Sequence, residues 1–579
     1  MKEKKTQKID FSSKRLGDLA DKFYNEGDFL SSLRFAYKQL DIYGGDGDVY
    51  VRLSDIYEGM DLHGSAVNWW FRFLHIAEIE DLPDIYEGLA VNFLAMGNES
   101  QSAYYYNKLI DVDETLPDET KIEIANAFSK AKKDNFKFVY PPRLADYSKE
   151  VSIGSKALKH GDCKRAIAEF SKVEKGSKEY LSAKEMQAVA HLLVGETSEA
   201  ESVCLELLKD EPDDVRILST LAAVYLEQDR KDESRAIALK LAAQTQTDTD
   251  ALYKVATVCC ENGLHEQAYL KFSQLDKKIS FDGRMLYFKG VSAYKSGRID
   301  EAERALDELC TIYPDAEVAK YYLKAIRRAK ENPDEKDLEL TYFYHLPQEE
   351  RESRCRTLIH IKNCPKDEVS LFGLVALHDG YFKWCFDEMD GNDHDLQYLG
   401  LLTAVHVRAD EFIQDVLLDY DVSDFLKIET LYMLLNRNED ADFGVVLCNI
   451  YRKVSLLRIK LGRKKRKRFL ESYAKVASRF IAVNESYAKK LKQAAEKLYR
   501  SLERYEALDL IENTDDCACA IFVLSGLKEL GKDAENVASA FGANPEKVGV
   551  LATMALSAQY GLDKNGILQN EKEIKDETD

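Results

Sequence analysis

The sequence predicts an all-α protein in which an α-solenoid of stacked helical hairpins is followed by an irregular helical region. The composition is 45% apolar and 32% charged with only 10 prolines, which suits a folded and mostly helical chain. A 34-residue repeat runs through the middle of the chain, and beyond it apolar residues recur at three- and four-residue steps. Since 579 residues exceed what one hydrophobic core organises, a solenoid or several domains are expected.

The repeat is marked by a turn residue and, five positions later, by a small residue. The turn residues, each 34 positions from the next, are Gly161, Gly195, Asp229, Gly263 and Gly297. The small residues in the same register are Ala166, Ala200, Ser234, Ala268 and Ala302. A small turn residue permits a tight reversal between antiparallel helices, and a small residue in the second helix lets the two helices approach closely. Because one hairpin cannot bury its own apolar face, consecutive hairpins must stack.

The clearest unit, FKGVSAYKSGRIDEAERALDELCTIYP (288–314), resembles a tetratricopeptide repeat. The residues that carry the resemblance are Gly290, Gly297, Ala302, Leu306 and Pro314. Looser copies upstream pair Gly27 with Ser32, Asp61 with Ala66 and Gly97 with Ser102. The resemblance covers most of residues 15–330, and Pro141–Pro142 is expected to mark a joint between two arrays. A final helix is expected over 315–333, ending at Pro333.

These patterns predict the following organisation of the chain. It begins with a basic tail (1–14), an N-terminal repeat-like array (15–140) and a main repeat array (141–332). It continues with an irregular helical-hairpin domain (333–450), a long basic helical segment (451–510), a small helical unit (511–565) and an acidic disordered tail (566–579).

The resemblance implies a concave groove, lined by the first helix of each unit, that receives a peptide or a partner helix. The groove positions carried over from the family are Arg216, Tyr253, Arg284, Tyr287, Tyr294 and Lys295. Tyr and Arg are favoured at binding hot spots, although the tyrosines here have the alternative of packing between adjacent helices. The family's carboxylate clamp for chaperone tails needs Asn where this chain has Ser155, Val189, Ala223 and Thr257. A partner with acidic or aromatic features is therefore favoured.

The sequence gives no support for catalysis, a cofactor or a metal. It lacks a Gly-rich phosphate loop, a G-x-S-x-G elbow and an H-E-x-x-H motif. A scatter of soft ligands is formed by Cys355, His360, Cys364 and His378, but its spacing does not match a structural zinc site. Asp41, Asp46 and Asp48 lack the downstream Glu of a calcium loop, which favours an ordinary turn.

A basic segment interrupts this acidic chain of net charge −21. Residues 452–504 hold 18 Lys and Arg against 4 Glu, and they include the run Arg463, Lys464, Lys465, Arg466, Lys467 and Arg468. Apolar residues at helical spacing from Phe469 onward put this run at the entrance of one long helix or two nearly continuous ones. Three interpretations stay open: a surface neutralised by acidic repeats, contact with nucleic acid or polyphosphate, and a nuclear address.

Residues 533–552 resemble a helix-turn-helix, with Ala538, Gly542 and Val548 at its spacing and Val537, Phe541 and Leu551 as core. Its second helix offers only Lys547 as a cation, which favours a generic packing unit. No apolar stretch is long enough to span a membrane. The sequence thus predicts a soluble, cytoplasmic and non-catalytic scaffold or adaptor that binds a protein or peptide partner. The alternative is a nucleic-acid-associated regulator that uses residues 452–504 and 533–552.

Overall fold

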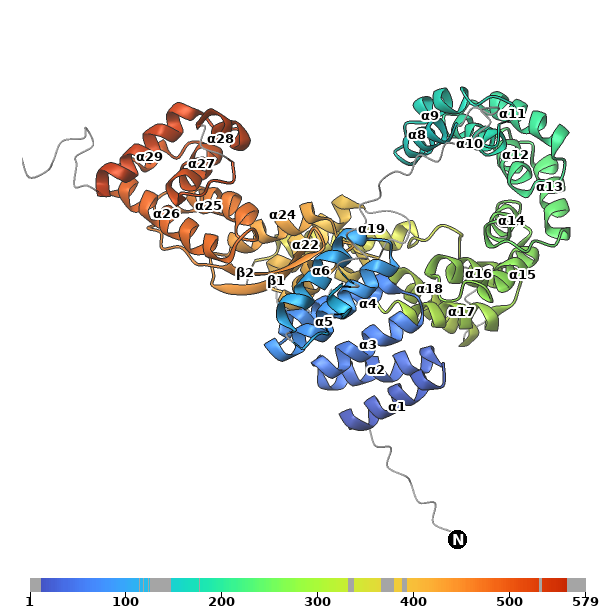
Figure 1. Ribbon diagram of the computed structural model, residues 1–579, viewed down its shortest axis with the longest axis horizontal. Coiled ribbons are helices and arrows are strands. Elements are labelled where there is room, and N and C mark those ends of the chain that lie inside the picture. The colour runs from blue at the N-terminus through green and yellow to red at the C-terminus, as the bar shows by residue number, and fades with distance from the viewer. Residues whose placement is uncertain are drawn as a thin grey trace, which may run out of the picture. The chain divides into compact units, whose positions relative to one another are not determined.

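The computed structural model describes residues 12–113, 115–117, 119–122, 124, 147–175, 177–331, 338–365, 380–387, 393–530 and 534–559. Two compact units divide the chain (Figure 1). Unit 2 comprises Lys130–Glu350 and Asp387–Gly391, and unit 1 comprises Met1–Ser129, Arg351–Phe386 and Asn392–Asp579. The predicted all-α solenoid architecture is confirmed, because paired antiparallel helices dominate both units.

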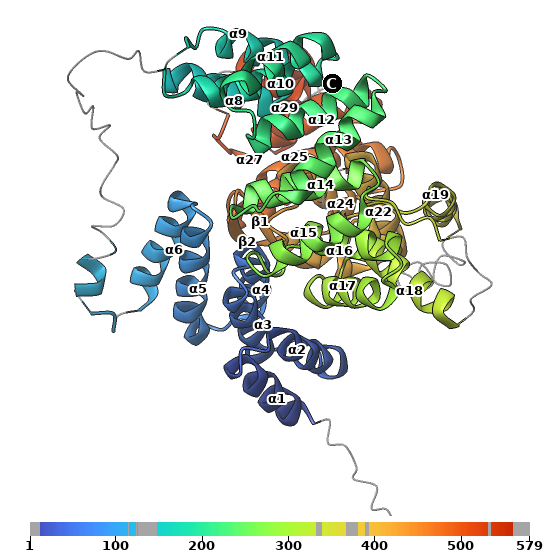
Figure 2. The same ribbon diagram turned by 90° about the vertical axis from the view of Figure 1, so that its right-hand side faces the viewer.

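Unit 2 is an array of helical hairpins whose first and second helices alternate along the chain. Its helices are α8 (Ser148–Lys159), α9 (Cys163–Phe170), α10 (Tyr180–Leu193), α11 (Thr197–Asp210), α12 (Val215–Glu227), α13 (Lys231–Ala243), α14 (Thr249–Glu261), α15 (His265–Asp276), α16 (Gly283–Lys295), α17 (Ile299–Ile312) and α18 (Glu317–Glu331). The array forms an arc with α8, α10, α12 and α14 on its inner side and α9, α11 and α13 on its outer side (Figure 1). Helices α12 to α17 lie in sequence order along it (Figure 2).

The 34-residue register arises from a left-handed residue at every hairpin turn. Gly297 has φ +80°, and its turn closes with backbone bonds from Gly297 N–H to Tyr294 O (3.0 Å) and from Arg298 N–H to Ala293 O (2.9 Å). The same pair of bonds closes the turn at Asp229, where φ is +58°. An L-residue pays a steric cost in this region, which glycine avoids and Asp tolerates. The backbone therefore dictates the residues that mark the repeat.

Small residues bring the two helices of each hairpin together. The predicted small positions of the second helices are fully buried: Ala166, Ala200, Ser234, Ala268 and Ala302. A second set of small residues with the same spacing runs through the first helices: Gly154, Ala188, Ala222, Ala256 and Gly290. A Cβ atom at Gly290 would lie 3.1 Å from Leu306 Cδ2, so the close approach of α16 and α17 leaves little space for a side chain.

Unit 1 begins with three further hairpins of the same kind. Their helices are α1 (Ser13–Asn25), α2 (Phe29–Tyr43), α3 (Gly47–Gly59), α4 (His63–Ile76), α5 (Leu82–Ala95) and α6 (Glu99–Val112), with a 3-10 turn at Ile79–Asp81. The turns again use left-handed residues, namely Gly27, Asp61 and Gly97. Ser32 and Ser102 each donate a hydroxyl hydrogen bond to a carbonyl of the preceding helix, at Ala20 O (2.7 Å) and Ala90 O (2.8 Å).

The described residues of the C-terminal part of unit 1 form helices and one β-hairpin. Its elements are α19 (Gln348–Asn363), which starts at the end of unit 2, then α21 (Tyr381–Trp384), α22 (His394–Val407), α23 (Asp410–Leu418), α24 (Asp424–Leu435), β1 (Ala441–Leu447), β2 (Ile450–Leu456), α25 (Arg466–Phe480), α26 (Glu485–Arg504), a 3-10 turn at Leu508–Leu510, α27 (Thr514–Ser525), α28 (Ala534–Phe541) and α29 (Pro545–Gln559). Helices α25, α26, α27 and α29 pack on one another as a small bundle.

The hairpin corrects the prediction of helix over the start of the basic segment. Strands β1 and β2 pair antiparallel, with Leu447 opposite Ile450. The two-residue loop between them, Cys448–Asn449, has positive φ at both positions (+51° and +60°), the geometry that a tight right-twisted hairpin requires. Cys-Asn is not one of the usual dipeptides for this turn, so the sequence pattern did not reveal it.

The N-terminal repeats pack against this hairpin and against α23. Tyr105 of α6 donates its hydroxyl hydrogen to the carbonyl oxygen of Asn449 at 2.8 Å. Arg72 of α4 forms an ion pair with Asp415 at 3.0 Å. These two contacts join residues 343 and 344 positions apart, and the sequence did not predict them.

Several sequence predictions fall outside the described residues: residues 1–11 of the basic tail, the joint at Pro141–Pro142, the stop at Pro333, and the acidic tail 566–579. Among the described helices, none combines the length and the hydropathy needed to cross a membrane.

Candidate partner-binding groove

A ladder of residues spaced by 34 follows the inner side of unit 2. The ladder consists of Glu185 on α10, Ser219 on α12, Tyr253 on α14 and Tyr287 on α16. Its chemistry changes from a carboxylate at the N-terminal end to tyrosines at the C-terminal end. We refer to the two ends as the charged half (α10 to α14) and the aromatic half (α14 to α18) of the groove.

The charged half is joined by ion pairs. Glu185, whose side chain is 10% exposed, lies 3.1 Å from Lys254 Nζ and 3.6 Å from Arg216 Nε. These three residues belong to three successive first helices, so one carboxylate links the inner faces of three repeats. Arg216 keeps a side-chain exposure of 42%. It is therefore partly neutralised yet still accessible to a partner.

The aromatic half holds a segment of the chain itself. Residues 338–346 (LELTYFYHL), which follow α18, contact α14, α16 and α18. Burial alternates along this segment, with Leu340, Tyr344 and Leu346 buried and Glu339, Phe343 and His345 exposed. The segment is neither helix nor strand: it bends at Tyr342, Phe343 and His345, and its buried side chains lie two or four residues apart.

Two groove tyrosines hold the backbone of the segment. Tyr287 Oη lies 2.9 Å from the carbonyl oxygen of Thr341 and 3.2 Å from that of Phe343. Tyr322 on α18 donates its hydroxyl hydrogen to the carbonyl oxygen of His345 at 2.9 Å. These three contacts go to the backbone of the segment and not to its side chains. Tyr287 is fully buried beneath it.

Tyr342 of the segment fills a pocket of mixed polarity formed by α14, α15 and α16. Its hydroxyl lies 2.9 Å from His265 Nδ1, and it is also hydrogen-bonded to the Cys260 thiol. Its ring meets Phe288 edge-on at 6.2 Å, and Lys295 Nζ lies 6.0 Å from the ring centroid. Burial raises the pKa of Tyr342 and of the Cys260 thiol, so both groups keep their protons at neutral pH.

Tyr344 fills a second, deeper pocket. Its ring meets Tyr287 edge-on at 4.9 Å, and its hydroxyl donates to Asp387 Oδ1 at 2.9 Å. Asp387 also accepts the backbone N–H of Val318 at 2.6 Å. Burial raises the pKa of Asp387 to about 7, despite the two hydrogen bonds that act in the opposite direction. Both tyrosines of the segment thus have their hydroxyls satisfied inside the groove.

Comparison with family models identifies the repeat type. Residues 156–259 match the model described as Psidin, N-terminal TPR repeats region. The chain contains tetratricopeptide repeats. A comparison with curated protein sequences found no significant match.

The comparison with solved structures found proteins that share little sequence with this chain. A tetratricopeptide repeat protein from Parabacteroides merdae is 12% identical, with 54% of this chain and 98% of that chain covered and a TM-score of 0.26. Yeast Tom70 is 13% identical, with coverage of 95% and 96% and a TM-score of 0.19. MamA of AMB-1 is 16% identical, with coverage of 28% and 89% and a TM-score of 0.22.

The residues predicted for the tetratricopeptide groove are found in different environments. Tyr287 and Lys295 contact the segment 338–346, as described above. Tyr253 is half-buried and packs on Phe272 and Phe288. Arg216 is in the ion-pair network, Arg284 is exposed near the start of α16, and Tyr294 is half-buried near its end. The structure thus brings Tyr253, Tyr287 and Lys295 to the aromatic half and Arg216 to the charged half.

The sequence did not reveal the residues that complete the groove. Phe288, Tyr322 and His265 come from the tetratricopeptide helices, but Asp387 comes from a segment with no repeat pattern. One signal was available: Leu340, Tyr342, Tyr344 and Leu346 alternate with other residues, which is typical of an extended chain. Their placement depends on contacts with residues that lie 23 to 77 positions away in the sequence.

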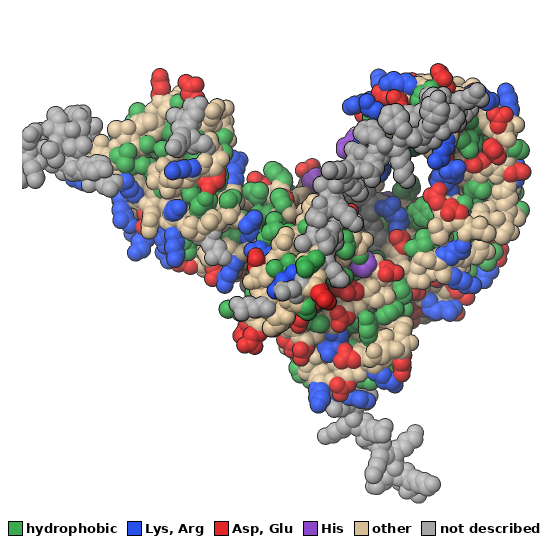
Figure 3. All heavy atoms as spheres, viewed as in Figure 1, with side chains coloured by type: hydrophobic (Ala, Val, Ile, Leu, Met, Phe, Trp, Pro, Cys, Tyr) green, Lys and Arg blue, Asp and Glu red, His purple; other side chains and the backbone are tan. Residues whose placement is uncertain are grey.

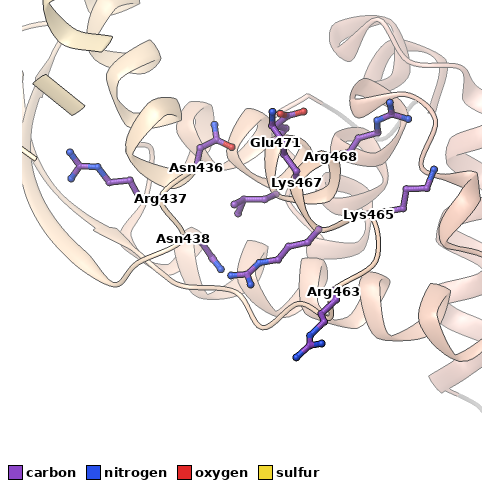
Figure 4. Close-up of a pocket in the computed structure, with 10 residues that line it drawn as sticks. Asn436, Arg437, Asn438, Arg463, Lys465, Lys467, Arg468 and Glu471 are labelled. Atoms are coloured by element: carbon purple, nitrogen blue, oxygen red, sulfur yellow. The ribbon is translucent and has the colours of Figure 1, made fainter. Parts of the chain in front are cut away.

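A second candidate surface lies in unit 1, where the cationic run leads into α25. An open hollow of about 850 Å³ is lined by Asn436, Arg437, Asn438, Arg463, Lys465, Arg466, Lys467, Arg468, Leu470 and Glu471 (Figure 4). Arg463 and Lys465 extend from the loop before α25 in different directions, and Arg437 points away from both (Figure 4). Lys and Arg side chains also gather along α25 and α26 (Figure 3). The cations therefore form a spread surface and do not converge on one point.

Only part of this surface is neutralised by the chain. Lys465 lies 3.3 Å from Asp509, and Arg468 donates to the carbonyl oxygen of Ile511 at 3.3 Å. The structure shows no acidic partner within 4 Å of Arg463, Lys464, Arg466 or Lys467 in the part of the chain that it describes.

The helix-turn-helix-like stretch is built as a packing unit. Val537, Phe541 and Leu551 are buried, and the Phe541 ring lies 5.6 Å from Phe522 of α27. Lys547, the cation of the second helix, lies 3.1 Å from Glu512. An intramolecular ion pair thus already engages that cation.

The candidate metal ligands do not form a cluster among the described residues. Cys364 Sγ lies 3.6 Å from His360 Nε2, as expected for residues one helical turn apart, and His378 lies outside the described part of the chain. Asp46 accepts the N–H of Val49 at 2.9 Å and so caps α3.

Proposed function

We propose that this chain is a non-catalytic scaffold that binds a protein partner as an extended peptide along the inner side of unit 2. The observation that supports the proposal is the segment 338–346, a non-helical stretch of the chain that already lies in the aromatic half of the groove. Hydroxyl groups that hold backbone carbonyls suit a peptide of any sequence, and aromatic pockets add selectivity. The partly exposed Arg216 extends the same surface into the charged half.

Site-specific photo-crosslinking tests this proposal. A photoreactive phenylalanine replaces Ala223, a half-buried residue on α12 of the inner side, or Leu239, which is 48% exposed on the outer helix α13. We expect a discrete adduct only from the inner position. The crosslinked protein is then identified, purified and rebound to the chain, and Arg216→Ala should weaken that binding. Equal adducts from both positions, or rebinding that ignores Arg216→Ala, would contradict the proposal.

A second candidate function, contact with a nucleic-acid backbone, is favoured by the four cations around the start of α25 that have no acidic partner among the described residues. Spread cations suit an extended chain of phosphates, whose binding weakens steeply with salt. The test is fluorescence anisotropy of labelled RNA and DNA strands over a salt series, with a variant that removes Arg463, Lys464, Arg466 and Lys467. The control removes four cations from α8 and α9 instead: Lys156, Lys159, Lys164 and Arg165. Loss of the salt dependence only in the first variant supports this function, and equal behaviour of both variants excludes it.

A further inference from the structure

The segment 338–346 occupies the surface on which the proposed function depends. Leu340 and Leu346 are 1% and 2% exposed, and Tyr344 is 8% exposed. Between them Phe343 stays 73% exposed and stacks on His345 at 6.1 Å. One edge of the segment is therefore inserted into the groove, while the other faces outward and contributes little to its retention.

The way in which the segment is held differs from that of a strand in a sheet. Among the described residues, the groove holds the backbone of the segment through three carbonyls, which accept from two tyrosine hydroxyls. Two N–H groups of the segment bond within the segment itself, Leu340 to Leu338 O and His345 to Phe343 O. The same tyrosine hydroxyls can donate to the carbonyls of a different bound peptide without any rearrangement of the helices.

The two side-chain pockets define the chemistry of an occupant. Tyr342 and Tyr344 are two residues apart, and their side chains enter the two pockets described above. Each pocket offers a ring partner and a polar partner for a phenol: Phe288 with His265, and Tyr287 with Asp387. Phenylalanine would fill either pocket but would leave buried polar atoms without a partner, which is unfavourable.

We propose that residues 338–346 are a built-in competitor for the groove and that the partner is an extended peptide with two tyrosines two residues apart. This inference rests on the proposed function, since it names the partner chemistry of the same groove. A tethered segment acts at an effective concentration on the order of millimolar. A partner that displaces the segment needs contacts beyond the two tyrosine pockets. The adjoining charged half, with Arg216 and Lys254, is the surface that would supply them.

The test uses the full chain and a labelled synthetic peptide, LELTYFYHLP, which copies residues 338–347. The peptide is titrated against the wild-type chain and against a variant with Tyr342→Ser and Tyr344→Ser, whose own segment is weakened. We expect the variant to bind at least about tenfold more tightly than the wild type, because it removes the tethered competitor. Phe343→Ser is the matched control, since this side chain points outward, and it should bind like the wild type.

The outcomes separate this inference from the proposed function. Equal affinity of the wild type and the double variant would overturn self-competition while leaving groove binding intact. No binding to either chain would overturn the two-tyrosine chemistry, whereas crosslinking at Ala223 judges the proposed function independently. Binding that converts the chain to a dimer in light scattering would assign the pockets to a second copy and overturn the heterologous partner.

A measurement on the wild-type chain tests the proposal even if the double variant misfolds. Hydrogen exchange of residues 338–346 in the wild type is followed with and without saturating peptide. Displacement should raise the exchange of this segment and leave that of α10 to α13 unchanged or slower. Exchange that stays the same while the peptide is bound would overturn the proposal, and circular dichroism of the double variant should retain the helical signal of the wild type.

Discussion

The hydroxyl of Tyr287 lies 2.9 Å from the carbonyl oxygen of Thr341, and the two residues are 54 positions apart in the chain. Through this bond and its second bond to Phe343, the buried face of α16 holds a non-helical segment of the same chain. The same tyrosine belongs to the ladder that continues into the charged half of the groove.

Tyr287→Phe tests the contribution of this hydroxyl to stability. The ring is kept, so packing is retained, but two carbonyl oxygens lose their donor. We expect unit 2 to lose about 1 kcal/mol of unfolding free energy, measured by urea denaturation. Tyr294→Phe on the same helix is the control, for which we expect a change of less than about 0.5 kcal/mol. Equal effects of the two substitutions would show that the Tyr287 hydroxyl is not engaged.

Asp387 should make the stability of unit 2 fall as the pH rises. Burial raises its pKa to about 7, and Glu317 and Asp315 add to the effect. Between pH 4, near the pKa of Asp387 in the unfolded chain, and pH 7, the folded state binds more protons than the unfolded chain. The contribution of Asp387 to stability is therefore fully present below about pH 4 and is lost as the pH rises through about 7. Asp387→Asn removes this titration and retains an acceptor for Tyr344 and Val318. We expect the variant to gain on the order of 2 kcal/mol relative to the wild type between pH 5 and pH 8. A constant difference in melting temperature across this range would contradict the assignment.

The turn residues predict opposite outcomes for two substitutions at equivalent positions. Gly297 has φ +80°, so Gly297→Ala should cost about 1–2 kcal/mol. Asp229 already occupies the same turn at φ +58°, and Asp229→Gly should be neutral or slightly stabilising because it relieves the steric cost. Thermal denaturation monitored by circular dichroism compares the two. A loss for Asp229→Gly as large as that for Gly297→Ala would be inconsistent with a common left-handed turn.

Tyr105 should couple the N-terminal repeats to the β-hairpin. Its hydroxyl donates to Asn449 O at 2.8 Å, and Tyr105→Phe leaves that carbonyl without this donor. We expect unit 1 to lose about 1 kcal/mol of unfolding free energy and the hairpin to exchange its amide hydrogens faster. The adjacent, half-buried Tyr104 offers a control, since Tyr104→Phe should leave hairpin exchange unchanged.

The sequence revealed those features of the fold that are repeated or local. Gly297 and Asp229 mark turns because a left-handed backbone restricts the choice of residue, and such restrictions leave a pattern every 34 positions. The sequence also predicted that a helix, α25, begins at the cationic run, because apolar residues at helical spacing start just after it. The hairpin was missed because Cys448–Asn449 reaches the required geometry without the usual dipeptide.

Sequence patterns did not predict that residues 338–346 lie in the groove. Ladder tyrosines such as Tyr287 were singled out, but nothing local indicates that Thr341 and Phe343 are their acceptors. Asp387 completes the Tyr344 pocket from a segment 43 positions further along the chain. Pairings of this kind depend on the packed structure, since no periodicity relates the two partners.

The central claim is that the aromatic half of the groove recognises an extended peptide through the Tyr287 hydroxyl. The most direct measurement is the affinity of LELTYFYHLP for the Tyr342→Ser, Tyr344→Ser chain, with and without the additional change Tyr287→Phe. We expect the additional change to weaken binding by about tenfold, since two carbonyl acceptors lose their donor. Unchanged affinity, with the helical signal intact, would contradict the claim.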